Sequence, residues 1–382
     1  MSILNSQIEK YPLLPYSILV WDMTRWMPGV YRFSMTFLWL GGAREKERIE
    51  YAIHTAMVNH PVFSMLVDWR GRHYPSSLAD IMHGSYMRID IEERGDDLVI
   101  KTYFNRILGD GRSGQILIED IQRAYLGLPL EKDDYWGYVA RFEQRKSEPH
   151  YAASCAWLVR EFADENIPLR PSIDRKWVRT LLPPHVGLYI EDYTSIREQL
   201  LCIVTDHHLT LDGIFSLCAA LAIAEYCGTD SAALTWAYEG RELPEEQRIF
   251  GSLHRDIPFY IQKSRIENRE SAIRHARNQI RFGIAHSDYP YTLMHPYTKR
   301  WNYAVNVLHW TDLEDFLPTV GLPLQLELEL KQKYAYALLD MEIVEHANSL
   351  HLRYRYSATH YKPESIRKFA DLVRKYVDWL ID

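Results

Sequence analysis

Several features that would assign this chain to a special structural class are missing from its sequence. No window approaches the ~18 apolar residues of a membrane-spanning helix. The opening MSILNSQIEKYPLLP lacks the basic and then apolar layout of a signal peptide. The only cysteines, Cys155, Cys202, Cys218 and Cys227, have neither metal-ligand spacing nor the density of a disulfide framework. We therefore expect a cytoplasmic protein with reduced thiols, no metal site and no membrane contact.

An excess of positive charge, internal repeats and low-complexity segments are also missing. The chain has 44 Lys and Arg against 51 Asp and Glu, which gives a net charge of −7. A nucleic-acid binder normally presents a basic face, so nucleic acid is not an expected partner. A length of 382 residues with 47% hydrophobic composition is enough for two lobes, each with its own core.

The hydrophobic patterns predict strands and helices in both halves of the chain. Alternating residues indicate strands, and apolar residues at spacings of three and four indicate helices. In the first half, strands are predicted at 31–37, 62–68, 87–91 and 98–104, and helices at 11–23, 45–59 and 135–158, with a further helix ending at Tyr125. In the second half, strands are predicted at 186–190, 303–310, 324–330, 335–342 and 350–356, and helices at 195–204, 212–226 and 363–380.

The segment Asn166–Asp174 is the best candidate for a linker, because it contains two prolines and no periodicity. Each half of the chain mixes strands with helices. The sequence therefore predicts an α/β (α+β) protein with an N-terminal lobe at 1–170 and a C-terminal lobe at 171–382.

The stretch 98–125 combines a predicted strand, a tight loop and a predicted helix. Its sequence, LVIKTYFNRILGDGRSGQILIEDIQRAY, places the pair Asp110-Gly111 in the loop. Side chains at the end of a rigid strand are well placed to contribute to a site. We therefore take this loop as the first candidate site.

A second candidate is HHLTLDG at residues 207–213, which fits the pattern HHxxxDG. A histidine in such a motif can act as a base on an amine or hydroxyl that attacks an acyl group. The flanking apolar residues, however, repeat at helical spacing on both sides, so His207 and His208 leave a helix, with Thr210 and Asp212 as candidate helix caps. We therefore interpret this pair as a helix-helix connection; a secondary functional role and a metal or catalytic pair are the other interpretations.

The series of segments resembles the condensation domains of nonribosomal peptide synthetases, within the chloramphenicol-acetyltransferase-like superfamily. YPLLPYSILVWDMTRWMPGVYRF is similar to the family's first motif. AIHTAMVNHPVFSMLVDWRGRHYP is similar to the region of its Arg-His-x-x-Leu-Arg motif, of whose charged residues only His60 remains. LLCIVTDHHLTLDGIFSLCAALAIAEYCG resembles the family's helix, turn and long helix, and TWAYEGRELPEEQRIFGSLHRDIPFYI its Gly-Arg and Gly-x-x-x-Asn-x-x-Pro segments. The resemblance covers nearly the whole chain.

The resemblance implies two chloramphenicol-acetyltransferase-like lobes, each a mixed sheet flanked by helices, with a channel between them. It places the family's HHxxxDG motif at residues 105–111, where Asn105 and Arg106 replace both histidines. Asp110 and Gly111 are retained, and Arg241 is the residue that the resemblance assigns as the partner of Asp110 from the other lobe. His207, His208 and Asp212 then have a structural role.

Replacing the histidines changes the chemistry that the site can perform. A guanidinium with a pKa above about 12 cannot accept a proton, so Arg106 cannot act as a general base. It can stabilise an oxyanion, bind a carboxylate or phosphate, or close the channel with a salt bridge.

The resemblance and this substitution leave three interpretations. The first is a non-catalytic or recruiting module for intermediates tethered to acyl or peptidyl carrier proteins, with a tailoring enzyme as a further partner. The second is an active acyltransferase that forms amide or ester bonds by positioning and oxyanion stabilisation. The third is a small-molecule binding protein on the same fold. We prefer the first, and expect no cofactor of the chain's own, because the carrier partner supplies the phosphopantetheine arm.

Overall fold

The computed structural model describes eleven stretches of the chain: residues 10–14, 16–18, 20–21, 32–68, 70–75, 86–162, 166–175, 185–288, 304–311, 324–327 and 337–382. By its contacts the chain separates into two compact units. Unit 1 comprises Met1–Pro149, Glu239–His254 and Leu313–Lys331, and unit 2 comprises His150–Tyr238, Arg255–Asp312 and Gln332–Asp382. This division differs from a single boundary between residues 170 and 171, because two segments from the second half of the sequence belong to unit 1.

Unit 1 is built on a four-stranded sheet in the order β11-β2-β6-β5. At one edge of the sheet, a hairpin joins β5 (Met87–Arg94) and β6 (Asp97–Asn105), which contain the strands predicted at 87–91 and 98–104, and Arg94 lies opposite Asp97 at its turn. On the other side of β6 lie β2 (Arg32–Trp39) and β11 (Leu324–Glu327). All these described pairings are antiparallel, whereas a mixed sheet was expected in each lobe.

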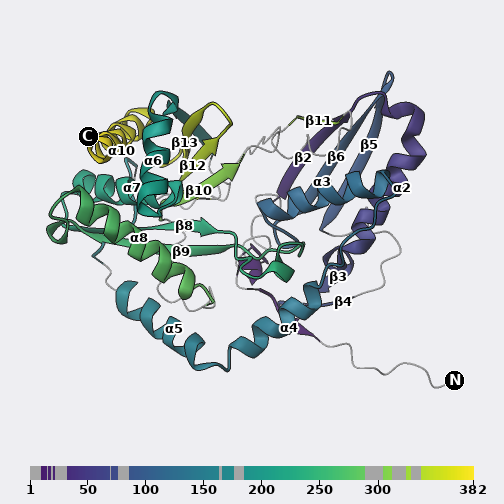
Figure 1. Ribbon diagram of the computed structural model, residues 1–382, viewed down its shortest axis with the longest axis horizontal. Helices are drawn as coiled ribbons and strands as arrows, with labels where there is room; N and C mark the ends of the chain where they lie inside the picture. The colour runs from purple at the N-terminus through teal and green to yellow at the C-terminus, as the bar shows by residue number, and fades with distance from the viewer. Residues whose placement is uncertain are drawn as a thin grey trace. The chain divides into compact units, whose positions relative to one another are not determined.

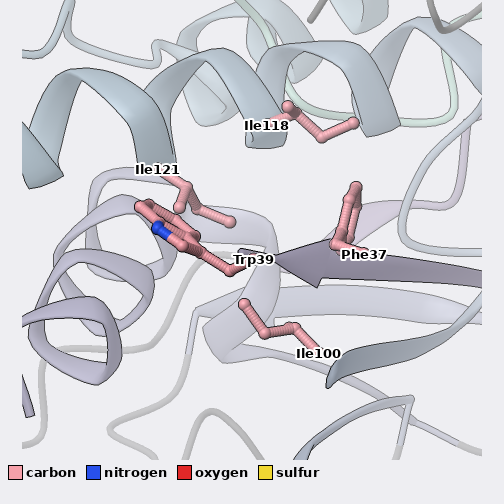
Figure 2. Close-up of a pocket in the computed structure, with 5 residues that line it drawn as sticks. All are labelled: Phe37, Trp39, Ile100, Ile118 and Ile121. Carbon is pink, nitrogen blue, oxygen red and sulfur yellow. The ribbon is translucent and has the colours of Figure 1, made fainter. Parts of the chain in front are cut away.

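Two helices belong to this sheet (Figure 1): α2 (Lys46–Asn59) and α3 (Gly111–Tyr125), which pack against each other. The predicted end of α2 is confirmed, because Pro61 pushes His60 into extended backbone. Figure 2 shows a small apolar pocket between α3 and the strands. It is lined by Phe37, Trp39, Ile100, Ile118 and Ile121, all of them buried. The pocket is part of the core that fixes α3 on the sheet.

The described part of unit 1 also contains a small sheet and a further helix. The sheet has the order β1-β4-β3, with β1 at Tyr11–Pro12, β4 at Arg72–Pro75 and β3 at Met65–Val67. The strand predicted at 62–68 is only partly formed, because Pro61–Ser64 adopts a 3-10 helix before β3. Helix α4 spans Tyr135–Arg145.

Unit 2 contains a six-stranded mixed sheet in the order β7-β13-β12-β10-β8-β9. Strand β10 runs parallel to both β12 and β8, and the remaining pairs are antiparallel. The strands are β7 (Val186–Asp192), β8 (Ser231–Tyr238), β9 (Arg255–Gln262), β10 (Asn306–Thr311), β12 (Leu339–Glu345) and β13 (Leu350–Ser357).

Helix α7 (Leu211–Cys227) is the central helix of unit 2 (Figure 1). Its residues from Gly213 to Ala224 are all buried, as expected for a helix that is apolar on every side. It contacts β8, β9 and β10, and also α8 (Arg269–Ala285) and α10 (Pro363–Ile381). The other helices are α5 (Pro149–Phe162) and α6 (Arg197–His207).

Several elements differ from the sequence predictions. The helix predicted over 135–158 is two helices, because α4 ends at Arg145 and Pro149 opens α5. The hydrophobic patterns do not predict β8, β9 or α8. Strand β9 contains Pro258, and it can form because it lies at the edge of the sheet, where a proline is tolerated. Parts of the elements predicted at 11–23, 303–310, 324–330 and 335–342 lie outside the described residues.

The predicted linker at 166–174 is packed into unit 2. Ile167 and Leu169 are buried in a cluster with Trp157, Ala233 and Ala304. Backbone carbonyls of the segment also accept hydrogen bonds, from Ala233 N to Pro168 O at 3.0 Å and from Val305 N to Leu169 O at 2.9 Å. These contacts hold the segment against unit 2.

Among the described residues, no single helix is long and apolar enough to cross a membrane; α6 with its preceding turn and α7 meet that length and composition only as a pair bent by 105°.

Candidate functional site

The first candidate site is the loop at residues 105–111, which we call the motif loop. Strand β6 ends at Asn105, whose buried side-chain oxygen accepts a hydrogen bond from Ile107 N at 3.0 Å. Asp110 is the N-cap of α3: its Oδ1 accepts from Ser113 N at 3.0 Å, and the Ser113 hydroxyl accepts from Asp110 N at 3.2 Å. This reciprocal capping box satisfies backbone donors that the start of a helix leaves exposed.

Gly109 is required by the close packing of the loop. A Cβ atom at this position would lie 2.8 Å from both Phe250 Cε1 and Ser113 Cβ. Contacts this short force neighbouring atoms to move, and both neighbours are in the buried core of unit 1. A side chain at 109 would therefore displace the loop from the segment that packs on it.

Asp110 forms a buried ion pair with Arg241. Arg241 Nη1 donates to Oδ2 at 3.0 Å and Nη2 to Oδ1 at 3.1 Å, and the two side chains are 0% and 6% exposed for Arg241 and Asp110. Burial alone would raise the pKa of Asp110, but Arg241 and the hydrogen bonds from Ser113 lower it below its usual value. The pairing that the resemblance implies is present, and Arg241 belongs by its contacts to unit 1 itself.

The residues that follow Arg241 fold around this ion pair, and we refer to Glu239–His254 as the 239–254 segment. The Arg241 guanidinium also donates to the carbonyls of Ile249 at 3.0 Å and Gly251 at 3.1 Å. Asp110 Oδ2 in turn accepts from the backbone N–H groups of Leu253 at 3.0 Å and His254 at 3.2 Å. The pair thus fixes both ends of the segment against the motif loop.

Arg106, to which the resemblance assigns the second motif position, is half-buried. Its Nη1 donates to the hydroxyl of Tyr16 at 3.2 Å. The Tyr16 ring packs on the ring of His254, with centroids 4.0 Å apart and planes at 50°. The structure therefore brings an imidazole from the 239–254 segment next to the motif loop. Sequence reasoning missed His254, because no local pattern connects residue 254 with residue 106.

A second charged cluster lies behind the motif loop. The fully buried His60 places Nδ1 2.8 Å from Asp133 and Nε2 3.2 Å from Asp120. Arg248, from the 239–254 segment, pairs with Asp120 and Glu119. Burial lowers the pKa of His60, but the two aspartates outweigh burial and raise it above its ordinary value. The cluster is a second ionic attachment of the segment to α3.

The second candidate, residues 207–213, is a turn between helices, and we call it the histidine-pair turn. Helix α6 ends at His207, and His208 adopts left-handed backbone with φ 50°. Thr210 caps α7 by accepting from Gly213 N at 3.1 Å. The predicted helix-helix connection is confirmed.

Asp212 lies inside the first turn of α7 and contacts a different histidine. His309 Nδ1 lies 3.4 Å from Asp212 Oδ2, and its Nε2 lies 3.3 Å from Glu345 Oε2. Burial lowers the pKa of His309, but the two carboxylates raise it overall. An imidazole between two carboxylates is stabilised in its protonated form, so this arrangement does not favour a base.

Within the stretches that the structure describes, no three histidine, cysteine or acidic side chains are grouped so that they could hold a metal ion.

One comparison with known proteins identifies the family of this chain. The family model described as Condensation domain matches residues 87–382. No curated protein sequence matches the chain significantly.

The chain is also similar to solved structures. The epimerization domain from the third module of tyrocidine synthetase B has a TM-score of 0.77 and 16% identity, covering 100% of this chain and 99% of that one. The X-domain in complex with OxyB from teicoplanin biosynthesis has a TM-score of 0.77 and 14% identity, covering 100% and 94%. A starter condensation domain of rhizomide synthetase in complex with C8-CoA has a TM-score of 0.75 and 13% identity, covering 98% and 95%. At these identities, the likeness establishes the α/β fold alone.

Proposed function

Because the chain belongs to the condensation-domain family, we propose that it binds acyl or aminoacyl thioesters tethered to carrier proteins, and that condensation dependent on the motif histidines is lost or altered. The observation that carries this proposal is the motif loop. Its scaffold of Asp110, Ser113 and Arg241 is complete, whereas the resemblance assigns the two histidine positions to Asn105 and Arg106.

The retained scaffold supports binding because its buried charges are paired, and the loop can therefore present a defined shape to a ligand. A buried carboxylate is expensive unless paired, and here it is paired and accepts further backbone hydrogen bonds. The loop therefore keeps a defined shape without the histidines. In this proposal the phosphopantetheine arm comes from the carrier partner. The complex of the X-domain with OxyB supports a tailoring enzyme as a further partner.

An active acyltransferase is the second candidate, and the position of Arg106 favours it. A half-buried guanidinium at the motif can stabilise the oxyanion that forms when an amine or hydroxyl attacks a thioester. A preorganised donor of this kind is worth on the order of a hundredfold in turnover. The crystal structure of the rhizomide starter domain with C8-CoA supports acyl thioesters as the substrate class.

The two candidates are separated by one experiment. The protein is incubated with a donor carrier protein loaded with an octanoyl thioester and an acceptor carrier protein loaded with a leucyl thioester. Carrier binding is measured by calorimetry, and amide formation by mass spectrometry. We expect every protein tested to bind the carriers, and the presence or absence of amide product decides between the two candidates.

Arg106→Ala is the test variant and Arg112→Ala its control, since Arg112 is another half-buried arginine and donates to Gln115 at 2.9 Å. Amide formed by the native protein and by Arg112→Ala, but not by Arg106→Ala, would establish the acyltransferase. Carrier binding without amide in any variant would establish the non-catalytic role. Absence of carrier binding would overturn the proposed function.

A further inference from the structure

We propose that His254 is the proton acceptor of the motif site, in the place of the two histidines that the motif loop lacks. This inference rests on the second candidate of the proposed function, the active acyltransferase, because it requires a thioester and an acceptor amine to react at the loop. It adds a named catalytic residue that lies outside the motif.

The backbone of His254 is fixed to the motif loop through Asp110. Its N–H donates to Asp110 Oδ2 at 3.2 Å, next to the bond from Leu253 N at 3.0 Å. Arg241 holds the same carboxylate in place with two hydrogen bonds. The position of residue 254 is therefore set by the ion pair that also sets the position of the loop.

The ring of His254 is oriented by Tyr16. The two ring centroids are 4.0 Å apart, and Tyr16 is only 6% exposed, so the phenol is a fixed surface for the imidazole. The Tyr16 hydroxyl accepts a hydrogen bond from Arg106 at 3.2 Å. Arg106, Tyr16 and His254 thus form a continuous set of contacts that starts at the degenerate motif position.

Exposure is consistent with a reacting group. His254 and Arg106 are both half-buried, whereas His60 is fully buried between two aspartates. A half-buried imidazole has surface available to a ligand while its backbone and ring are held. Among side chains, imidazole changes protonation nearest to neutral pH, and a guanidinium cannot accept a proton at all.

The reaction balances with the groups named. The imidazole of His254 takes a proton from the attacking amine as its nitrogen bonds to the thioester carbonyl carbon, and Arg106 stabilises the negative charge on the carbonyl oxygen. The carbon–sulfur bond then breaks, and the imidazolium returns the proton to the departing thiolate. The products are an amide and a free thiol, and no oxidant, metal or cofactor is consumed.

The test uses the octanoyl-loaded donor and leucyl-loaded acceptor carriers with three proteins: native, His254→Ala and His254→Gln. General base catalysis contributes about a hundredfold or more, so both variants should form amide at least about a hundredfold more slowly, with carrier binding unchanged. Added imidazole should restore turnover to His254→Ala, which has space for it.

The control is His207→Gln, a histidine of the histidine-pair turn, which should turn over at the native rate. Circular dichroism establishes that each variant is folded, and His254→Gln keeps the side-chain size if His254→Ala does not fold. Native turnover in His254→Gln, or carrier binding without any amide from the native protein, overturns this inference and leaves the proposed function standing. If the native protein does not bind the carriers, both this inference and the proposed function are overturned.

Discussion

Two Asp-Gly pairs stand at the start of helices in this protein, and they are held in different ways. In the motif loop, Asp110 is itself the N-cap of α3 and forms a buried bidentate pair with Arg241. In the histidine-pair turn the cap is Thr210, so that Asp212 lies two residues further along, within the first turn of α7. There its carboxylate contacts the partly exposed His309 of unit 2.

The difference shows that a seven-residue pattern does not define a site by itself. The segment 207–213 matches HHxxxDG in letters, yet its aspartate is displaced from the cap position. The segment 105–111 lacks both histidines, yet it places its aspartate at the cap, with an arginine from a distant segment. The position of the helix cap and the partner of the carboxylate distinguish the two.

The largest expected effect comes from breaking the ion pair of the motif loop. Arg241→Ala leaves the Asp110 carboxylate buried without its partner, so the free energy of unfolding should fall by about 3–5 kcal/mol. Urea denaturation followed by tryptophan fluorescence measures the change. Asp212→Asn is the matched variant in the histidine-pair turn and should cost about 1 kcal/mol or less, because its pair is partly exposed. Equal losses of unfolding free energy in the two variants would show that the two aspartates are held equally strongly.

The next effect concerns the cluster behind the motif loop. His60→Gln leaves Asp133 without a cationic neighbour and leaves Asp120 paired with Arg248 alone, so it should cost about 2 kcal/mol near pH 6. The pKa of His60 is raised in the folded protein, so its contribution is fully present below about pH 6.5 and is lost as the pH rises through that raised value.

The stability difference between the native protein and His60→Gln should therefore shrink toward alkaline pH, measured by urea denaturation from pH 5 to 9. His54→Gln is the control, because His54 lies on α2, the helix that ends just before His60, and is exposed. A difference that stays constant with pH would show that folding does not shift the pKa of His60, and one that grows toward alkaline pH would show that His60 is neutral in the folded protein.

A smaller effect is expected from the cap of the histidine-pair turn. Thr210→Ala removes the acceptor of the Gly213 N–H and should lower the free energy of unfolding by about 1 kcal/mol. Thr210→Ser keeps the acceptor and should restore most of the loss. Carrier binding should be unchanged in both variants, and a change in binding would give this turn a role that its geometry does not explain.

The smallest effect concerns His208. Its backbone is left-handed, which costs a non-glycine residue roughly 1–2 kcal/mol, partly offset by the entropy that glycine loses on folding. His208→Gly should therefore be about 0.5 kcal/mol more stable than the native protein in thermal unfolding. Amide formation or carrier binding by His208→Gly and by His207→Ala should match the native protein. A large loss with the fold preserved would show that the histidine-pair turn is the functional site.

Local patterns in the sequence predicted much of the fold. The resemblance predicted which residues form the candidate site, and that location stays a prediction. The β5–β6 hairpin, the end of α2 at Asn59 and the turn between α6 and α7 each depend on neighbouring residues and are confirmed. The patterns did not predict β8, whose small and mixed residues do not alternate, or α8, whose apolar stripe is narrow among arginines.

The contacts around the site depend on the path of the chain in space, and the hydrophobic periodicity of the sequence contains no information on that path. Tyr16, Arg106 and His254 are distant in sequence and meet only because the 239–254 segment folds onto unit 1. His60 could be singled out by the resemblance, but its partners Asp120 and Asp133 lie on two other elements. Such constellations become visible only once the segments are placed.

The attachment of the 239–254 segment also has a consequence for synthesis on the ribosome. Arg241 lies 131 residues after Asp110, and Gly251 lies 138 residues after Ser113, to which it is hydrogen-bonded. A nascent chain that has emerged only as far as α7 therefore still lacks the cation for Asp110 and the aromatic ring of Phe250. Domains usually fold in order as they emerge, but here the first unit waits for residues made after the central helix of the second. Translation itself thus delays completion of the site until the 239–254 segment has followed the first part of unit 2 out of the ribosome.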